Sequence, residues 1–324
     1  MTICTATDKP IVADLKKVTA LSSNSLQQQL GIIAALLTVF IWSTYFLSLR
    51  SSALSPLSIT ELALFRFAIP GILLLPLFIK RWEKIRKVPL PYLLAMMTCA
   101  GLPFFLLSGS AMGIASVAYG STLLPGVAPL FVTLIAVVIF KQPFEIFKKI
   151  GLTVIILGVL FLLASNWQSF DIEQSKGQIM LLAASLLWAI FTVAVRLSGL
   201  KPLEAAAVVA LPSAVAIVVY ICLTGSADLG YSQISIKELL LHMLVQGIGV
   251  GLLASYFYGY AISKLGAELT SAIGSLTPVL ASLWALFLFS EQLNGTTITG
   301  MIFTVLGVII ASGMLKNIEI SNKK

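Results

Sequence analysis

The chain has 324 residues, of which 10% are charged and 58% are hydrophobic, and its mean hydropathy is +1.01. An ordinary soluble domain has roughly 25% charged residues. Because so few charges cannot cover a water-exposed surface of this size, a soluble fold is excluded and lipid must surround most of the chain. The formal net charge of +8 is by itself also typical of proteins that bind nucleic acid or an anionic surface.

Ten apolar segments run along the chain. A transmembrane helix needs about 20 apolar residues to cross the roughly 30 Å hydrocarbon core. The segments are 30–49, 57–79, 90–112, 117–140, 149–165, 177–198, 203–224, 239–262, 267–290 and 296–315, of which the fifth is short. Proline, glycine, serine and charged residues separate most of them. The sequence predicts an all-α integral membrane protein with ten transmembrane helices.

Polar tails flank these segments. The first covers 1–29, and we expect little regular structure in it. The second covers 316–324. Most of the 21 basic residues fall in the tails and in every second loop. Basic residues concentrate in cytoplasmic loops, so both termini are predicted to be cytoplasmic in a multi-pass protein of the plasma or inner membrane. This distribution explains the net charge without a nucleic-acid partner.

The two halves of the chain share residues at matching positions. They are Gly31–Trp42 with Gly177–Trp188, Pro129 with Pro278, Gly151 with Gly300, and Gly158 with Gly307. Each half has five predicted spans. Five is an odd number, so the second copy must cross the membrane in the opposite direction to the first.

Loop charges test this inversion. The basic loop 80–87 corresponds to 225–238, which carries one lysine beside acidic residues. The basic loop 141–149 corresponds to 290–296, which has no lysine or arginine. Matching loops with opposite charge bias are what inverted topology requires. The sequence therefore predicts two inverted five-helix repeats, 30–165 and 177–315.

Inverted repeats recur in secondary transporters, where the site lies near the midplane between the halves. The order and duplication of several motifs also resemble the drug/metabolite transporter superfamily, in particular its ten-helix branch with two EamA-type domains. The motifs are Gly31–Trp42 and its copy ending at Trp188, Leu64-Phe65-Arg66-Phe67, Pro129 with Pro278, Phe289-Ser290-Glu291-Gln292, and Gly158 with Gly307. The family often has glutamate where this chain has Gln142, so no role is carried to that position.

The architecture and the resemblance imply a secondary transporter. We expect it to export small metabolites, amino acids or amphipathic compounds by alternating access at the seam between the repeats. The alternatives are an integral membrane enzyme that acts on lipid-linked substrates, which generally needs clustered His, Asp or Glu, and a membrane scaffold or receptor-like protein. The sequence has no P-loop and no metal-binding cluster, so we expect no cofactor. The expected partners are a small-molecule substrate and the lipid bilayer, and the expected assembly is a monomer or homodimer.

Arg66 is the most informative charged residue. It lies well inside the second predicted helix, where a charge is costly unless it faces a cavity, a partner or water. One hypothesis is that it anchors an anionic or carboxylate-bearing substrate or forms part of a gate. The other is a structural charge satisfied by helix ends and carbonyls. Both stay open at this point.

Aromatic residues are the second set of candidates for substrate binding. They can line a cavity that holds an amphipathic solute by stacking, with hydroxyls as orienting groups. Helix packing and interfacial belts are the alternative. The residues are Trp42 and Tyr45, Trp188, Tyr256 and Tyr260, and Trp284. The two tryptophans are favoured because both copies keep them.

The remaining ionisable residues are expected near the membrane surfaces. Glu61 precedes Arg66 by less than two turns and is interpreted as a solvated interfacial carboxylate. His242, the sole histidine, can relay protons, but solvation is the favoured interpretation. Glu268 and Glu291 lie near helix ends and are interpreted as solvated or capping residues.

Overall fold

A computed structural model describes residues 8–143, 145–164, 172–224 and 230–312 of the protein. This part of the chain is helical and has no strand. Its elements are α1 (Asp8–Ala53), α2 (Ile59–Ile85), α3 (Leu90–Cys99), α4 (Leu102–Ile114), α5 (Val117–Val138), α6 (Ile146–Ala164), α7 (Ile172–Ser198), α8 (Pro202–Thr224), η1 (Gly230–Gln233), α9 (Ile236–His242), η2 (Met243–Leu253), α10 (Ala254–Leu265), α11 (Ala267–Gly274), α12 (Thr277–Phe289) and α13 (Gly295–Ala311).

Within the described residues, nine helical segments are long and apolar enough to cross a membrane, and a tenth, Gly295–Ala311, is apolar but shorter. Together they match the ten predicted spans, and the all-α membrane fold is confirmed. The first helix is longer than predicted, since α1 begins at Asp8 inside the segment where little regular structure was expected. A helix need not stop at the edge of the lipid when the next residues also permit helix. The tail 316–324 lies outside the described residues.

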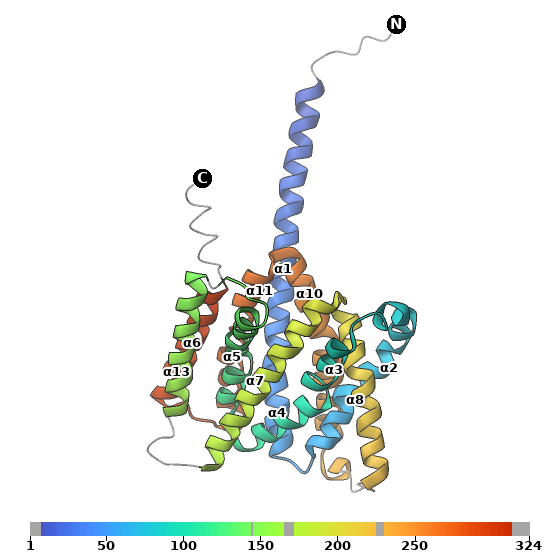
Figure 1. Cartoon of the computed structure of the whole chain (residues 1–324), viewed down its shortest axis with the longest axis vertical. Coiled ribbons are helices and arrows are strands. Elements are labelled where there is room, and N and C mark those ends of the chain that lie inside the picture. Colours follow the sequence, from blue (N-terminus) through green and yellow to red (C-terminus); the bar gives the residue numbers. More distant parts are fainter. Residues whose placement is uncertain (1–7, 144, 165–171, 225–229, 313–324) are drawn as a thin grey trace.

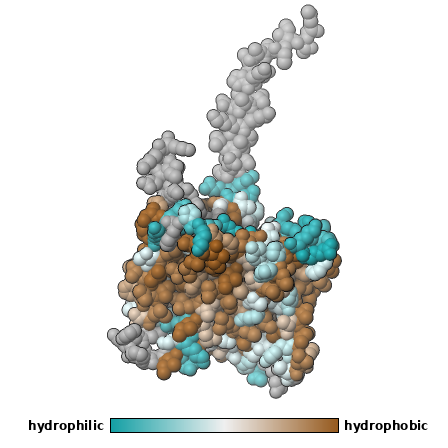
Figure 2. Space-filling model, in the orientation of Figure 1, coloured by the Kyte–Doolittle hydropathy of each residue, from teal (hydrophilic) through white to brown (hydrophobic). Residues whose placement is uncertain are grey.

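Apolar side chains cover the outside of the bundle (Figure 2). Hydrophobic residues form a broad band on its lateral surface in this view, and hydrophilic residues gather at its two ends. Many large hydrophobic side chains are exposed, among them Ile72 at 71% and Phe287 at 72%. In water such a surface would drive aggregation, whereas in a bilayer it meets lipid tails.

Two of the predicted spans are interrupted helices. The third is divided into α3 and α4 at Ala100 and Gly101, just before Pro103. The break frees backbone groups, and the Ser213 hydroxyl of α8 accepts a hydrogen bond from the Leu102 amide at 3.1 Å. The ninth is divided into α11 and α12 just before Pro278. Such breaks are tolerated at membrane depth only where protein or water satisfies the freed groups.

The eighth span contains a π-helix. Its wider turns occupy η2, which lies between two α-helical ends, α9 and α10. Glycines let this segment approach α2 closely. A Cβ placed on Gly247 would lie 2.6 Å from Ile69, and one on Gly251 would lie 2.8 Å from Pro70. The small-residue pattern that the sequence shows here therefore serves packing inside one chain.

The two five-helix copies are inverted with respect to each other. Figure 1 shows α1 and α7, the first helices of the two copies, running in opposite directions along the bundle. Corresponding helices meet, because α2 packs against α8 and α6 packs against α13. α1 packs on α10 and α12 of the second copy, and α7 packs on α4 and α5 of the first copy. The first helix of each copy therefore packs on helices of the other copy.

Matching glycines bring α6 and α13 together. A Cβ on Gly158 would lie 2.7 Å from the Thr304 amide nitrogen and 2.8 Å from the Gly300 carbonyl oxygen. A Cβ on Gly307 would lie 2.7 Å from the carbonyl oxygen of Gly151. Only glycine permits this backbone approach. The matching glycines of the two repeats thus join the copies to each other.

Candidate functional site

The capping box at the start of α2 fixes where this helix begins. The Ser58 hydroxyl accepts the Glu61 amide at 3.2 Å, and the Glu61 carboxylate accepts the Ser58 amide at 2.6 Å. The Glu61 side chain is only 2% exposed. The prediction of a solvated carboxylate is therefore wrong, since the residue turns back into the cap instead of outward.

Arg66 lies in the next turns of α2 and is partly buried. Its guanidinium carbon lies 5.6 Å from the centre of the Phe67 ring. Among the described residues it has no hydrogen-bond or ion-pair partner. A cation in a membrane helix without an acidic partner is costly.

Tyr45 joins α1 to α4 beside Arg66. Its hydroxyl lies 3.2 Å from the hydroxyl of Ser108, and both residues are buried. Its ring contacts Phe46 edge-on at 5.1 Å and tilts against Phe105 at 6.5 Å. The packing holds the phenol in place, so that its polar end remains directed at the polar groups between the helices.

Trp42 and Trp188 each pack across the seam between the copies. The Trp42 ring of α1 lies 5.0 Å from that of Tyr258 in the second copy. The Trp188 ring of α7 lies 5.5 Å from that of Phe104 in the first copy, and 4.9 Å from its own neighbour Phe191. Both tryptophans are partly buried. The structure thus places the duplicated tryptophans at equivalent positions between the repeats.

The other predicted aromatic residues lie elsewhere. Tyr256 is 50% exposed and stacks on Tyr260, with 6.4 Å between the ring centres. Trp284 is 41% exposed on α12. None of the three contacts Trp42, Tyr45, Arg66 or Trp188 through an aromatic pair or a hydrogen bond in the described part of the chain. Tyr258 contacts the Trp42 ring of α1, and Tyr260 packs against the small cluster of Ala34, Ala35 and Ala261.

A buried polar network links α1 to the eighth span near Tyr45. His242 Nδ1 lies 2.8 Å from Ser48 Oγ, and the Gln246 amide donates to the same oxygen at 3.0 Å. His242 is 2% exposed and Gln246 is fully buried. The prediction of a solvated histidine is therefore wrong. His242 ends α9 where the π-helix begins, and α1 and α2 both pack against that π-helix.

Glu291 forms an ion pair at the same face of the bundle. Its Oε1 accepts a hydrogen bond from the Nε of Arg50 at 2.9 Å. Its Oε2 accepts a hydrogen bond from the Val117 amide at 2.9 Å, and this second bond caps α5. Arg50 also donates to the carbonyl oxygens of Met112 and Gly113 at 3.1 and 3.2 Å. The capping interpretation of Glu291 is confirmed, and the ion pair was not expected. The side chain of Glu268 lies outside the described part of the protein.

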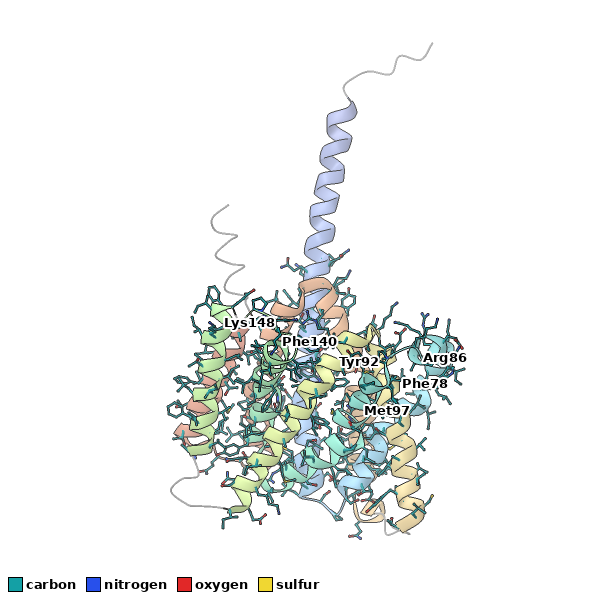
Figure 3. All side chains as sticks on the ribbon, in the orientation of Figure 1. Phe78, Arg86, Tyr92, Met97, Phe140 and Lys148 are labelled. Carbon is teal, nitrogen blue, oxygen red and sulfur yellow. The ribbon has the colours of Figure 1, made fainter. Side chains whose placement is uncertain are left out.

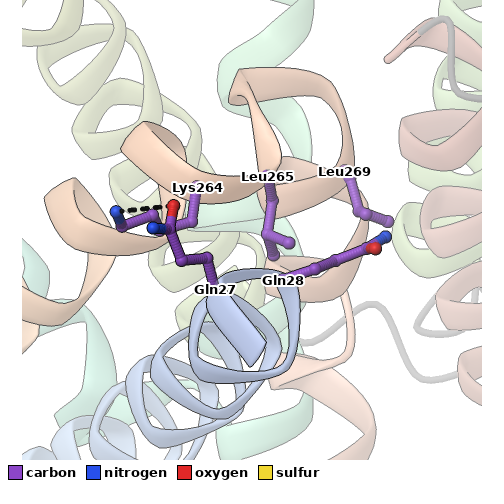
Figure 4. Close-up of a pocket in the computed structure, with 5 residues that line it drawn as sticks. All are labelled: Gln27, Gln28, Lys264, Leu265 and Leu269. Atoms are coloured by element: carbon purple, nitrogen blue, oxygen red, sulfur yellow. Dashed lines mark hydrogen bonds between the residues drawn. The ribbon is translucent and has the colours of Figure 1, made fainter. Parts of the chain in front are cut away.

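Two surface hollows lie apart from these residues. The first, of 270 Å³, lies beside α1 where it meets the end of α10, and Lys264 donates to Gln27 there at 3.2 Å (Figure 4). The second, of 370 Å³, is an apolar groove between α3, α5 and α7. Tyr92 and Phe140, labelled in Figure 3, line this groove. Neither hollow is lined by a predicted site residue.

Comparisons with known proteins agree with this arrangement. A crystal structure of another protein aligns with a TM-score of 0.59 at 19% identity, over 87% of this chain and 95% of that one, which shows a common fold. No curated protein sequence matches the chain. The sequence model of the EamA-like transporter family matches twice, over residues 29–164 and 175–313. The chain therefore belongs to the EamA-like transporter family of the drug/metabolite transporter superfamily.

Proposed function

We propose that the protein is a secondary transporter that exports small metabolites, amino acids or amphipathic compounds, by alternating access at the seam between its two inverted repeats. One observation carries the proposal. Arg66 presents a guanidinium within a membrane-spanning helix that has no acidic partner among the described residues. A carboxylate-bearing solute satisfies such a group through charge-assisted hydrogen bonds.

The tryptophans extend this proposal to the rest of the solute. Trp42 and Trp188 lie at the seam, each against an aromatic ring of the other copy. Movement of one repeat against the other changes the spacing of these pairs. Aromatic faces that separate in this way offer stacking surfaces to the apolar part of an amphipathic solute.

The proposed location is the plasma or inner membrane, with both termini in the cytoplasm. Figure 1 shows α1 beginning and α13 ending at the same face of the bundle. The basic residues Arg86 and Lys148, labelled in Figure 3, are at this face as well. Positive charge favours the cytoplasmic side. Labelling single cysteines, placed in the loop 80–87 and in the turn before α13, with an impermeant reagent in intact cells tests this orientation.

Flux into proteoliposomes tests the function. We expect at least one member of a panel of amino acids, carboxylates and amphipathic cations to cross faster than in empty liposomes. Arg66→Gln should slow a carboxylate-bearing substrate by about tenfold or more, since a hydrogen bond to a charged group contributes about 1.5–3 kcal/mol. Arg196→Gln, the same change at an exposed position, is the matched control and should leave flux unchanged.

Two outcomes contradict the proposal. The first is flux across the whole panel that never exceeds that of empty liposomes, with protein that is folded by thermal unfolding. The second is equal flux in the Arg66→Gln and Arg196→Gln variants, which removes the role given to the guanidinium.

A further inference from the structure

The network around His242 contains two buried polar atoms without a hydrogen-bond partner. They are the Nε2 of His242 and the Oε1 of Gln246. The side chains are 2% and 0% exposed. Leaving a buried polar atom unpaired costs about 1–3 kcal/mol. Two such atoms in one network destabilise the fold, so a purely structural role does not account for them. They indicate that the network binds a further ion or molecule for part of the time.

A carboxylate stands next to the free nitrogen. The Glu238 side chain, one helical turn before His242, places its Oε1 4.0 Å from His242 Nε2. This carboxylate is 34% exposed, whereas the imidazole is 2% exposed. Glu238 lies in the first turn of α9, at the face opposite the start of α1 (Figure 1). The pair thus connects solvent at that face to a base inside the bundle.

We propose that His242 is a proton-binding site loaded through Glu238, and that the proton bound there is the coupling ion of transport. When the imidazole carries its single proton on Nδ1, that N–H donates to Ser48 and Nε2 bears a lone pair. A proton on the Glu238 carboxyl group moves to Nε2, which leaves a carboxylate facing an imidazolium. The charges of the two side chains sum to the same value before and after this step.

Proton binding acts on the contact between α1 and the eighth span. The Ser48 hydroxyl of α1 accepts a hydrogen bond from the Gln246 amide and forms a second hydrogen bond with His242. It therefore contacts both residues of the eighth span. An imidazolium must donate from both nitrogens. The bond from Nδ1 to Ser48 is the same in both states, and the new N–H on Nε2 draws the Glu238 carboxylate toward the ring. The proton therefore favours one packing of these helices, which is what a coupling ion must do.

Other charged groups lie on the helices that pack against the network. On α1 and α2, Arg50 pairs with Glu291, Glu61 is held in its capping box, and Arg66 lies against Phe67. On α8, Tyr220 and Cys222 are exposed. Lys264 of α10 lies at the opposite end of the span, next to Gln27. In the described part of the chain, Glu238 is the one acidic side chain within 4.0 Å of the imidazole.

The sole histidine of the chain allows a direct measurement. The probe is the proton itself, and the readout is the NMR spectrum of full-length protein carrying isotope-labelled histidine, purified through a tag without histidine. We expect one titrating imidazole. Glu238→Gln should shift the titration midpoint to lower pH, because an opposite charge favours the protonated ring. Glu83→Gln, at an exposed glutamate on another helix, should leave the midpoint unchanged.

Ser48→Ala provides a second variant with the histidine retained. Loss of the Nδ1 partner should change the tautomer signature of the ring nitrogens in the neutral form. The proposal is overturned by a ring that stays neutral wherever the protein is folded, or by equal midpoints in the wild type and Glu238→Gln. It is also overturned by a tautomer signature in Ser48→Ala identical to that of the wild type.

The use of this proton rests on the proposed function, and flux measurements separate the two claims. With a transported substrate, an imposed pH gradient should change the flux of the wild type but not that of His242→Gln. A pH-gradient response that persists in His242→Gln overturns coupling through this site. If the histidine titrates but no substrate crosses, the proposed function fails and the proton site stands.

Discussion

The ion pair between Arg50 and Glu291 is the interaction whose removal we expect to destabilise its end of the bundle most. Glu291→Gln keeps the size of the side chain and removes its charge. The carboxylate accepts two bonds at 2.9 Å, one from Arg50 and one from the Val117 amide. Bonds to a charged group contribute about 1.5–3 kcal/mol, and breaking a fully buried ion pair costs about 3–5 kcal/mol.

The exposure of the two side chains decides between these magnitudes. They are 19% and 10% exposed, so water partly compensates the charge left on Arg50. The amide oxygen of the substituted side chain can still accept one of the two bonds. We therefore expect Glu291→Gln to lower the free energy of unfolding by about 2 kcal/mol. Arg50→Gln should cost more, because Arg50 also donates to the carbonyl oxygens of Met112 and Gly113.

Reversible unfolding in mixed micelles, as a function of the mole fraction of denaturing detergent, measures these values. The double variant should cost less than the sum of the two single changes, by about 1–2 kcal/mol, because the ion pair is counted twice in that sum. Glu83→Gln is the control, since its partner Arg86 and Glu83 itself are more than half exposed. It should cost below about 0.5 kcal/mol. Additive losses in the double variant would refute the assigned coupling.

Two further variants test how the copies are joined. Gly158→Ala should destabilise the protein by about 1–3 kcal/mol, because its Cβ meets the backbone of Thr304 at 2.7 Å. Gly295→Ala, where nothing lies within 4 Å, should be neutral or stabilising in the same unfolding assay, and equal losses at the two sites would contradict the packing argument. Glu204→Gln should also lower stability, by about 1–2 kcal/mol, because Lys84 donates to its carboxylate at 2.5 Å across the α2–α8 contact and the Lys201 amide donates at 2.8 Å. A melting temperature equal to that of the wild type would contradict this estimate.

Hydropathy and charge were enough to predict the ten spans and their inverted repetition. Apolar length is imposed by the bilayer, and loop charge is imposed by its two sides, so each is readable without knowledge of packing. The duplicated tryptophans were also readable, because Trp42 and Trp188 keep equivalent places at the seam. Apolar length and loop charge are local in the sequence, and the tryptophans repeat within it, so all three can be recognised without the structure.

Features that depend on neighbouring helices could not be predicted. The π-helix from Met243 to Leu253 leaves no mark in the pattern of apolar residues, and neither does the contact of Tyr258 with Trp42 of α1. Glu61 and His242 are near helix ends in the sequence, where solvation is the reasonable interpretation. They are buried because a capping box turns the first inward and because α1 encloses the second.

The glycine contact between α6 and α13 makes the interface self-complementary, as in a symmetric dimer. Gly158 meets the backbone at Gly300, and Gly307 meets the backbone at Gly151, so each copy presents the same surface to the other. Because α6 belongs to the first copy and α13 to the second, two separately expressed halves carry the surfaces by which each recognises the other.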